Sequence, residues 1–127
     1  MAMAGFRISR PARADLERIL EISLERWGER GQERYRELLV AALHAIASEP
    51  DGPSTRDRGS LGGRLRGFHL RHARHPHGVH DPVHIIYDRW TRSSSIEVVR
   101  ILHERIDPTT HLDVATQRGM PGRKRRP

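Results

Sequence analysis

At the start of the chain, apolar residues first lie two positions apart and then recur at the spacing of a helix. Phe6 and Ile8 lie two positions apart, as residues on one face of a strand do. Ser9 follows as a candidate helix N-cap, with Pro11 in the first turn, where its missing N–H is not needed. Apolar residues then recur at helical spacing as far as Trp27, which predicts an amphipathic helix of roughly four to five turns. The stripe comprises Ala12, Leu16, Ile19, Leu20, Ser23, Leu24 and Trp27.

A second helix is predicted from about Gln32 to Pro50. Gly28 ends the first helix and Gly31 completes the break, so the connection between the two helices is short. Helices joined in this way pack as antiparallel neighbours, and we therefore expect a helical hairpin. The second apolar stripe comprises Tyr35, Leu38, Leu39, Ala42, Leu43, Ala45 and Ile46.

Two apolar residues fall outside these stripes. On a projection of about 100° per residue, Ile22 on the first helix and Val40 on the second lie roughly 60° away from the apolar sector. They are candidates for surface positions that a partner covers. Scattered exposed apolar residues are also normal on monomeric proteins, so each residue taken singly has an equally acceptable interpretation without function.

The second half of the chain shows strand patterns separated by loops. Asp51–Gly63 is rich in glycine and predicts a surface loop, and Ala73–Pro82 has no period and predicts a long hairpin loop. Strands are predicted at Leu65–Arg71, at Val83–Trp90 and, most strongly, in the β-branched run Ile96–Asp107. Strands joined by hairpins form an antiparallel meander.

The order β-α-α-β-β-β predicts an α+β fold, in which a helical hairpin lies on one face of a small antiparallel sheet that the N-terminal strand joins. We assign residues 1–112 to this single domain. Residues 113–127 are polar and then basic, and we expect them to form a disordered tail.

The last predicted strand is apolar on both sides. Strict alternation places Ile96, Val98 and Leu102 on one side and Val99 and Ile101 on the other. We therefore expect one set to close the core beneath the helices and the other to face a partner.

Composition narrows the class of protein. The 127 residues contain 23 Lys and Arg against 16 Asp and Glu, a formal charge of +7, and nearly all the cations are arginine, which suits an acidic or polyanionic partner. There is no cysteine, which excludes disulfides and thiolate chemistry. The longest apolar run, Leu38–Leu43, is too short to cross a bilayer, and the N-terminus does not resemble a signal peptide. We expect a cytoplasmic protein without membrane association.

Histidine is concentrated in one stretch, since six of the nine histidines lie between His69 and His84. Zinc sites need ligands aimed by rigid elements, whereas most of this stretch is predicted to be a loop, so we expect no metal site and no cofactor. The candidate ligands considered were His72, His75, His77 and His80.

A second group of polar residues comes from three neighbouring strands and could converge. Histidine, tyrosine and arginine can supply the acid, the base and the cation that a ribonuclease needs when a 2′-hydroxyl attacks its own phosphodiester. Strand parity, however, places Arg100 and His103 on opposite faces of the sheet. The simpler interpretation is that these are polar residues at the sheet edges that make ordinary hydrogen bonds. The group comprises His69, Arg71, Tyr87, Arg100 and His103.

Five short motifs follow one another along the chain. They are Ile8-Ser9-Arg10-Pro11-Ala12-Arg13-Ala14-Asp15-Leu16, Trp27-Gly28 before Tyr35, Leu65-Arg66-Gly67-Phe68-His69-Leu70-Arg71-His72-Ala73-Arg74, His84-Ile85-Ile86-Tyr87 and Val99-Arg100-Ile101-Leu102-His103-Glu104-Arg105-Ile106-Asp107. In this order and at compatible spacing, they resemble the ParE toxins of the RelE/ParE superfamily. The likeness covers about Phe6 to Leu112, and Ile106 stands where methionine is frequent in the family.

The resemblance implies the toxin of a type II toxin–antitoxin module, which inhibits DNA gyrase without covalent chemistry and without binding specific DNA on its own. It also implies a ParD-like antitoxin whose C-terminal segment folds around the toxin. We expect gyrase to be contacted by Arg71, Arg100 and His103. We expect the antitoxin to be contacted by Ile22, Val40, Ile96, Val98 and Leu102.

Two other interpretations stay open. A RelE-like, ribosome-dependent messenger-RNA endonuclease would use Arg71, Tyr87, Arg100 and His103 as its acid, base and phosphate-stabilising groups. A chain that has lost toxicity and survives as an antitoxin-binding partner would need none of them. The histidine-rich loop 72–82 and the basic tail vary in such proteins, so the resemblance implies nothing about them.

Overall fold

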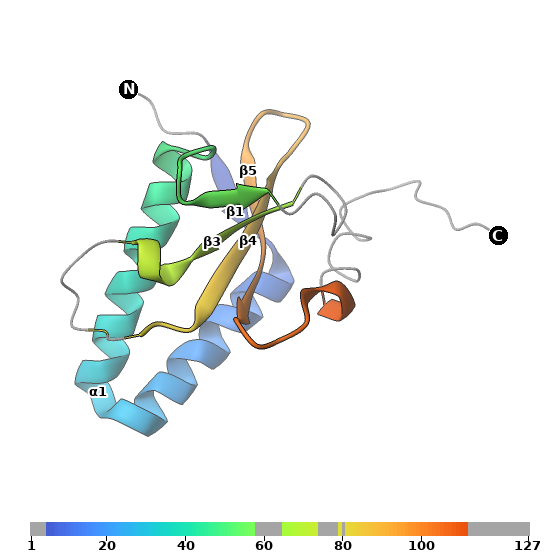
Figure 1. Ribbon diagram of the computed structural model, residues 1–127. Coiled ribbons are helices and arrows are strands. Elements are labelled where there is room, and N and C mark those ends of the chain that lie inside the picture. The colour runs from blue at the N-terminus through green and yellow to red at the C-terminus, as the bar shows by residue number, and fades with distance from the viewer. Residues whose placement is uncertain (1–4, 58–64, 74–78, 80, 112–127) are drawn as a thin grey trace.

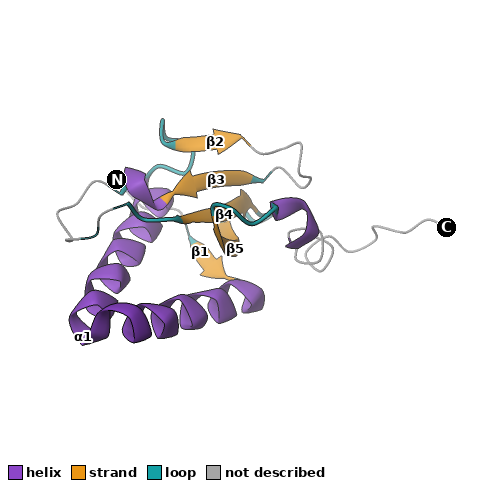
Figure 2. Cartoon of the chain, turned by 60° about the horizontal axis from the view of Figure 1, so that its bottom comes forward, coloured by secondary structure: helices purple, strands orange, loops and turns teal. Residues whose placement is uncertain are grey.

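The computed structural model describes residues 5–57, 65–73, 79 and 81–111 (Figure 1). Within these residues, one long kinked helix covers one face of a five-stranded sheet (Figure 2). The α+β prediction is therefore confirmed, while residues 113–127, the predicted tail, lie outside the described part of the chain. The elements are β1 (Phe6–Ile8), α1 (Arg10–Ser48), β2 (Thr55–Asp57), β3 (Arg66–His69), the 3₁₀ helix η2 (Leu70–His72), β4 (His84–Trp90) and β5 (Ile96–His103).

The start of α1 follows the capping prediction. The Ser9 hydroxyl accepts a hydrogen bond from the Ala12 backbone N–H at 3.2 Å, and a proline occupies the first turn. The same hydroxyl donates to the Val99 carbonyl oxygen at 2.8 Å. One serine therefore both starts the helix and ties it to the last strand.

The predicted break at Gly28 is confirmed and is confined to a single residue. Gly28 has φ 76° and ψ −175°, a backbone conformation that is essentially restricted to glycine, and helical geometry resumes directly after it. Gly31 therefore lies inside the helix rather than in a connection. Its own lack of a side chain lets Trp27 pack closely, because a Cβ atom at this position would stand 2.1 Å from the Trp27 Cβ.

β5 is the second strand of the sheet, whose order is β1-β5-β4-β3-β2. It pairs with β1 in parallel and with β4 antiparallel, and all other pairs are antiparallel. Because β1 ends at Ile8, opposite Val98, the outer edge of β5 beyond that point needs other partners. Ser9 N–H donates to the Val98 oxygen at 3.0 Å, and the Asp15 carboxylate accepts the Ile101 N–H at 2.9 Å.

A β-bulge in β5 overturns part of the predicted alternation. Tyr87 pairs with Arg100 but the next residue of β4 pairs with Val98, so Val99 is the extra residue of the bulge. The parity of every later residue in the strand is shifted by one position as a result. The prediction that Leu102 shares a face with Ile96 and Val98 is therefore wrong.

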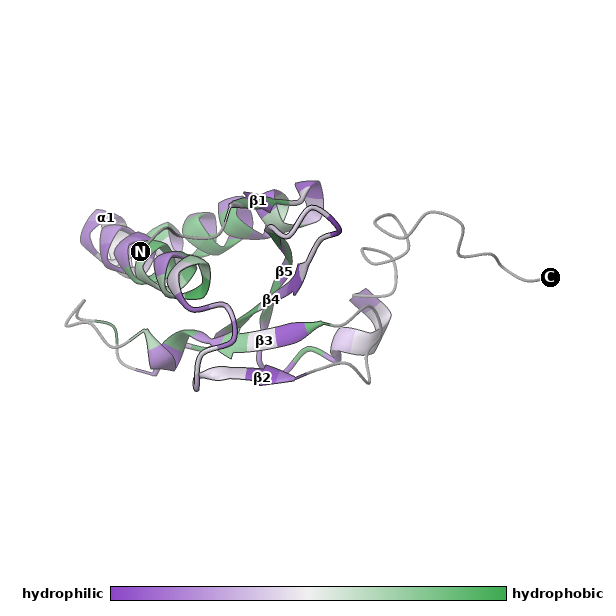
Figure 3. Ribbon diagram, turned by 90° about the horizontal axis from the view of Figure 1, so that it is seen from above, coloured by the Kyte–Doolittle hydropathy of each residue, from purple (hydrophilic) through white to green (hydrophobic). Residues whose placement is uncertain are grey.

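The sheet has an apolar cluster on each face. Side chains of α1, β1, β3, β4 and β5 form the larger cluster, and the hydrophobic side of α1 is turned toward the sheet (Figure 3). The β5 members of this helix-side cluster are Ile96, Val98 and Ile101. The second cluster, on the other face, consists of Leu65, Tyr87, Val99 and Leu102, with Ile85 packed against it.

Two other local predictions were wrong. Thr55–Asp57 was expected to be loop but forms β2, because its three residues pair with β3. Leu24 and Trp27 were counted with the core-facing stripe but are exposed. Both residues are close in sequence to the kink at Gly28, where the junction between the two arms of α1 projects past the ends of β4 and β5 (Figure 1).

The conformation of Gly28 gives a first testable prediction. Substituting Gly28→Ala introduces no clash, since nothing lies within 4 Å of the added Cβ, but it forces a side chain into the positive-φ conformation. We expect the free energy of unfolding to fall by about 1–3 kcal/mol. Glu29→Ala, on the adjacent exposed turn, is the matched control and should change it by less than about 0.5 kcal/mol. Equal urea midpoints for the two variants would contradict the single-residue kink.

Candidate functional site

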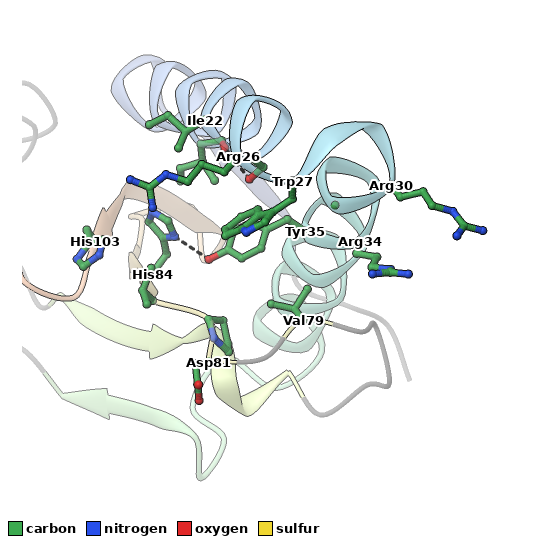
Figure 4. A pocket seen from close by; sticks show the side chains of 15 residues that line it. Ile22, Arg26, Trp27, Arg30, Arg34, Tyr35, Val79, Asp81, His84 and His103 are labelled. Atoms are coloured by element: carbon green, nitrogen blue, oxygen red, sulfur yellow. Dashed lines mark hydrogen bonds between the residues drawn. The ribbon is translucent and has the colours of Figure 1, made fainter.

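A cleft of about 860 Å³ lies between the two arms of α1 and the adjoining ends of β4 and β5 (Figure 4). Its volume falls within the range of ordinary ligand-binding clefts. The projecting junction of α1 forms one wall, and the segment that leads into β4 forms the other. The lining residues are Ile19, Ile22, Ser23, Arg26, Trp27, Arg30, Gly31, Arg34, Tyr35, Val79, Asp81, Pro82, Val83, His84 and His103.

A tyrosine and two histidines form the inner end of the cleft. The Tyr35 hydroxyl lies 2.7 Å from Nδ1 of His84, and the rings of His84 and His103 meet edge to face with centroids 5.7 Å apart. Burial, reinforced by the nearby His103, lowers the pKa of His84 to about 4. Burial also raises the pKa of Tyr35 to about 12. Both side chains are therefore uncharged at neutral pH.

The outer part of the cleft is cationic and carries an exposed indole. Arg26, Arg30 and Arg34 recur every four residues, and none of them has an ion-pair partner among the described residues. Arg26 extends toward the two histidines, whereas Arg30 and Arg34 point outward (Figure 4). Trp27 is 57% exposed, with its ring centroid 6.2 Å from that of Tyr35.

The five residues expected to contact an antitoxin divide into two groups. Ile22 is 41% exposed and lines the cleft, and Val40 is 48% exposed on the second arm of α1, outside the cleft. Ile96, Val98 and Leu102 are buried within the fold of this chain. The two exposed residues alone offer side chains that a partner can reach without opening the core.

The four residues considered for a ribonuclease are held apart. Tyr87 and Arg100 are cross-strand neighbours, but Tyr87 is buried in the cluster on the face away from α1. Arg100 reaches round the edge of β5 to Asp15, with Nε and Nη2 at 2.7 and 2.9 Å from the two carboxylate oxygens, and this hydrogen bonding raises its pKa. His103 lies on the opposite face, in the cleft, and Arg71 belongs to η2.

Arg71 borders a second, smaller hollow of about 430 Å³, which shares Val79, Asp81, Pro82 and Val83 with the cleft. At its rim His69 Nε2 lies 2.7 Å from the Glu104 carboxylate. This hydrogen bond lowers the pKa of Glu104, and the charge of Arg71 acts in the same direction. Of the predicted polar group, His69, Arg71 and His103 therefore lie near Glu104, whereas Tyr87 and Arg100 do not.

The described residues contain no group of three or more histidine, aspartate or glutamate side chains placed to hold a metal ion. Of the histidine candidates, His75, His77 and His80 lie outside the part of the chain that the structure describes. No described helix is long and apolar enough to span a membrane.

Sequence reasoning missed most of the cleft. Tyr35 was assigned to the core stripe and does belong to the core, but its hydroxyl also meets His84 in the cleft, a contact that the stripe does not reveal. The four-residue spacing of Arg26, Arg30 and Arg34 was visible in the sequence. On its own, that spacing is typical of any solvated helix face.

The neutral state of His84 gives a second prediction. Its folded pKa of about 4 lies below the ordinary 6.5, so the unfolded chain binds the proton first as the pH falls. The stabilisation is complete above about pH 6.5 and is lost toward pH 4, with about 2 kcal/mol lost between pH 7 and pH 5.

The matched variant is His84→Asn, which keeps an acceptor near Nδ1 but does not titrate. Between pH 7 and pH 5, the free energy of unfolding measured in urea should fall by about 2 kcal/mol more for the wild type than for the variant. The buried Asp88 is present in both proteins, so its own titration cancels in the difference. Parallel pH profiles would show that His84 is not held neutral.

Comparison with known proteins places this arrangement in a family. The family model described as "ParE toxin of type II toxin-antitoxin system, parDE" matches residues 6–108. Toxin ParE1 of Caulobacter vibrioides is 30% identical over 110 residues, which cover 87% of this chain and 99% of that protein. The matched region contains β1 to β5 and every residue of the cleft. The chain belongs to the ParE toxin family of type II toxin–antitoxin systems.

Proposed function

We propose that this ParE-family toxin inhibits DNA gyrase and that a ParD-like antitoxin neutralises it by docking in the cleft between the arms of α1. The observation that carries the antitoxin part is the exposed apolar wall of that cleft. Ile22 and Trp27 are accessible there, beside arginines without partners in the described residues. An amphipathic segment laid into a hydrophobic groove is a common mode of peptide recognition.

Charge supports an acidic occupant. The chain carries a formal charge of +7, and Arg26, Arg30 and Arg34 stand along one side of the cleft. Positive and negative patches that face each other increase the association rate and exclude wrong partners. An acidic antitoxin segment with apolar anchors matches both properties of the surface.

The separation of the candidate ribonuclease residues supports a toxin that acts by binding its target protein and not by cleaving RNA. A general acid, a general base and a phosphate-binding cation must lie around one reacting phosphate. Arg100 is held by Asp15 at one edge of β5, and Tyr87 is enclosed on the face away from His103. We therefore assign His103 and Arg71 to contact with gyrase and Arg100 to orienting Asp15.

The target is tested by inducing the protein without its antitoxin. We expect DNA synthesis to stop first and the SOS response to follow, because a gyrase trapped on cleaved DNA blocks replication. Radiolabelled thymidine and methionine incorporation, followed in parallel, measures the order. Early translation arrest with continuing replication would favour the messenger-RNA endonuclease. Purified protein should also block supercoiling of relaxed plasmid by purified gyrase.

The docking surface is tested separately with charged substitutions. Ile22→Asp places a carboxylate on the apolar wall and should weaken antitoxin binding by about tenfold or more, since central apolar contacts contribute over 1 kcal/mol. Val40→Asp should have a smaller effect, because Val40 lies outside the cleft. Leu24→Asp is the control, an equally exposed residue that does not line the cleft. Unchanged affinity for Ile22→Asp, measured by calorimetry, would remove the cleft from the interface.

A further inference from the structure

The inner end of the cleft presents hydrogen-bond donors. Burial keeps the Tyr35 phenol protonated, and its hydroxyl can donate to Nδ1 of His84, 2.7 Å away. A neutral imidazole that accepts at Nδ1 carries its proton on Nε2. With the phenol as the donor, His84 carries its ring proton on Nε2.

His103 is fixed in the same tautomer by a different contact. Its Nδ1 accepts the backbone N–H of Arg105 at 3.0 Å, which leaves Nε2 as the protonated nitrogen of the neutral ring. Within the described chain neither the His84 nor the His103 Nε2 has a hydrogen-bond partner, and neither is a sealed, unsatisfied polar atom. Two imidazole rings from adjacent strands, with centroids 5.7 Å apart, thus each have an Nε2 that is not sealed in the core.

Arg26 adds a permanent charge to the same place. It lines the cleft, extends over the His84 and His103 side of it, and has no ion-pair partner in the described residues (Figure 4). A guanidinium has five N–H donors and no acceptor. Donors from one arginine and two imidazoles on the same side of a cleft are complementary to an oxyanion, and charge-assisted hydrogen bonds are among the strong ones.

We propose that Arg26 and the Nε2–H groups of His84 and His103 form a carboxylate-binding site, which receives an aspartate or glutamate side chain of the antitoxin. The identification of the occupant as part of an antitoxin rests on the proposed function. Ile22, Trp27 and Pro82 wall the approach, so the carboxylate belongs to a segment that also carries apolar side chains. Because His103 is assigned to gyrase contact, a carboxylate seated there covers a residue that the toxin needs for its target.

The donor arrangement can be read in the full-length toxin alone. Long-range ¹H–¹⁵N spectra of the imidazoles at pH 7.5 should show both rings protonated at Nε2. Titration with sodium acetate should shift the Nε2 and Hε1 signals of His84 and His103 along a saturable curve, whereas sodium chloride at the same ionic strength should not. Arg26→Gln should abolish the acetate response. Arg18→Gln, on an exposed part of α1 outside the cleft, should retain it.

Several results would overturn the site. These are an Nδ1-protonated tautomer for either ring, no saturable acetate response, or an equal response in Arg26→Gln. Saturable shifts with sodium phosphate but none with acetate would overturn the carboxylate assignment and identify a phosphate site. Thermal unfolding of Arg26→Gln, whose side chain is exposed, should match that of Arg18→Gln and so confirm that both variants are folded.

The partner is tested with the purified antitoxin. Arg26→Gln should weaken antitoxin binding about tenfold to a hundredfold relative to Arg18→Gln, the loss expected for a hydrogen bond to a charged group. An acetate response combined with unchanged antitoxin affinity would overturn the antitoxin as the occupant. Neither measurement involves gyrase, so failure of the gyrase proposal would leave both results intact.

Discussion

The fold depends on how the outer edge of β5 is completed. Strand edges present rows of N–H and C=O groups that need partners, and β1 supplies them for only three residues. Ser9 and Asp15 then continue the edge from the first turns of α1. Since Asp15 also holds the Arg100 guanidinium, one short part of the helix fixes both the backbone and a side chain of β5. The position of the first helical arm over the sheet follows from these contacts.

Much of this architecture is encoded in local signals that the sequence displays. Ser9 with a following proline predicts the start of the helix, and Gly28 predicts the kink because few other residues adopt its backbone conformation. The features that could not be predicted depend on pairing between distant segments. The bulge at Val99 is a property of β4 and β5 together, and β2 exists as a strand because β3 lies beside it. Residue types alone do not determine either register.

The residues of the cleft show the same limit of prediction from sequence. Apolar periodicity identified Trp27 as a residue of the core-facing stripe, but whether sheet lies beneath a helix depends on the lengths of the elements and the angle between them. Ile22 was identified correctly as an exposed residue, because its departure from the stripe is a property of the helix itself. Tyr35, His84 and His103 come from three elements and become neighbours only in the folded chain.

The projecting junction of α1 separates the residues that fold the chain from those that line the outer cleft. Ile22, Arg26, Trp27 and Arg30 are exposed and contribute little to the core, whereas the helix-side cluster is formed by other residues. Substitutions at these positions should therefore change the free energy of unfolding only slightly. The shape and charge of this part of the cleft can vary while the fold is retained. After gene duplication, a few surface substitutions would suffice for one copy to bind a different partner. Two such copies in one cell would then each bind their own partner and not that of the other copy.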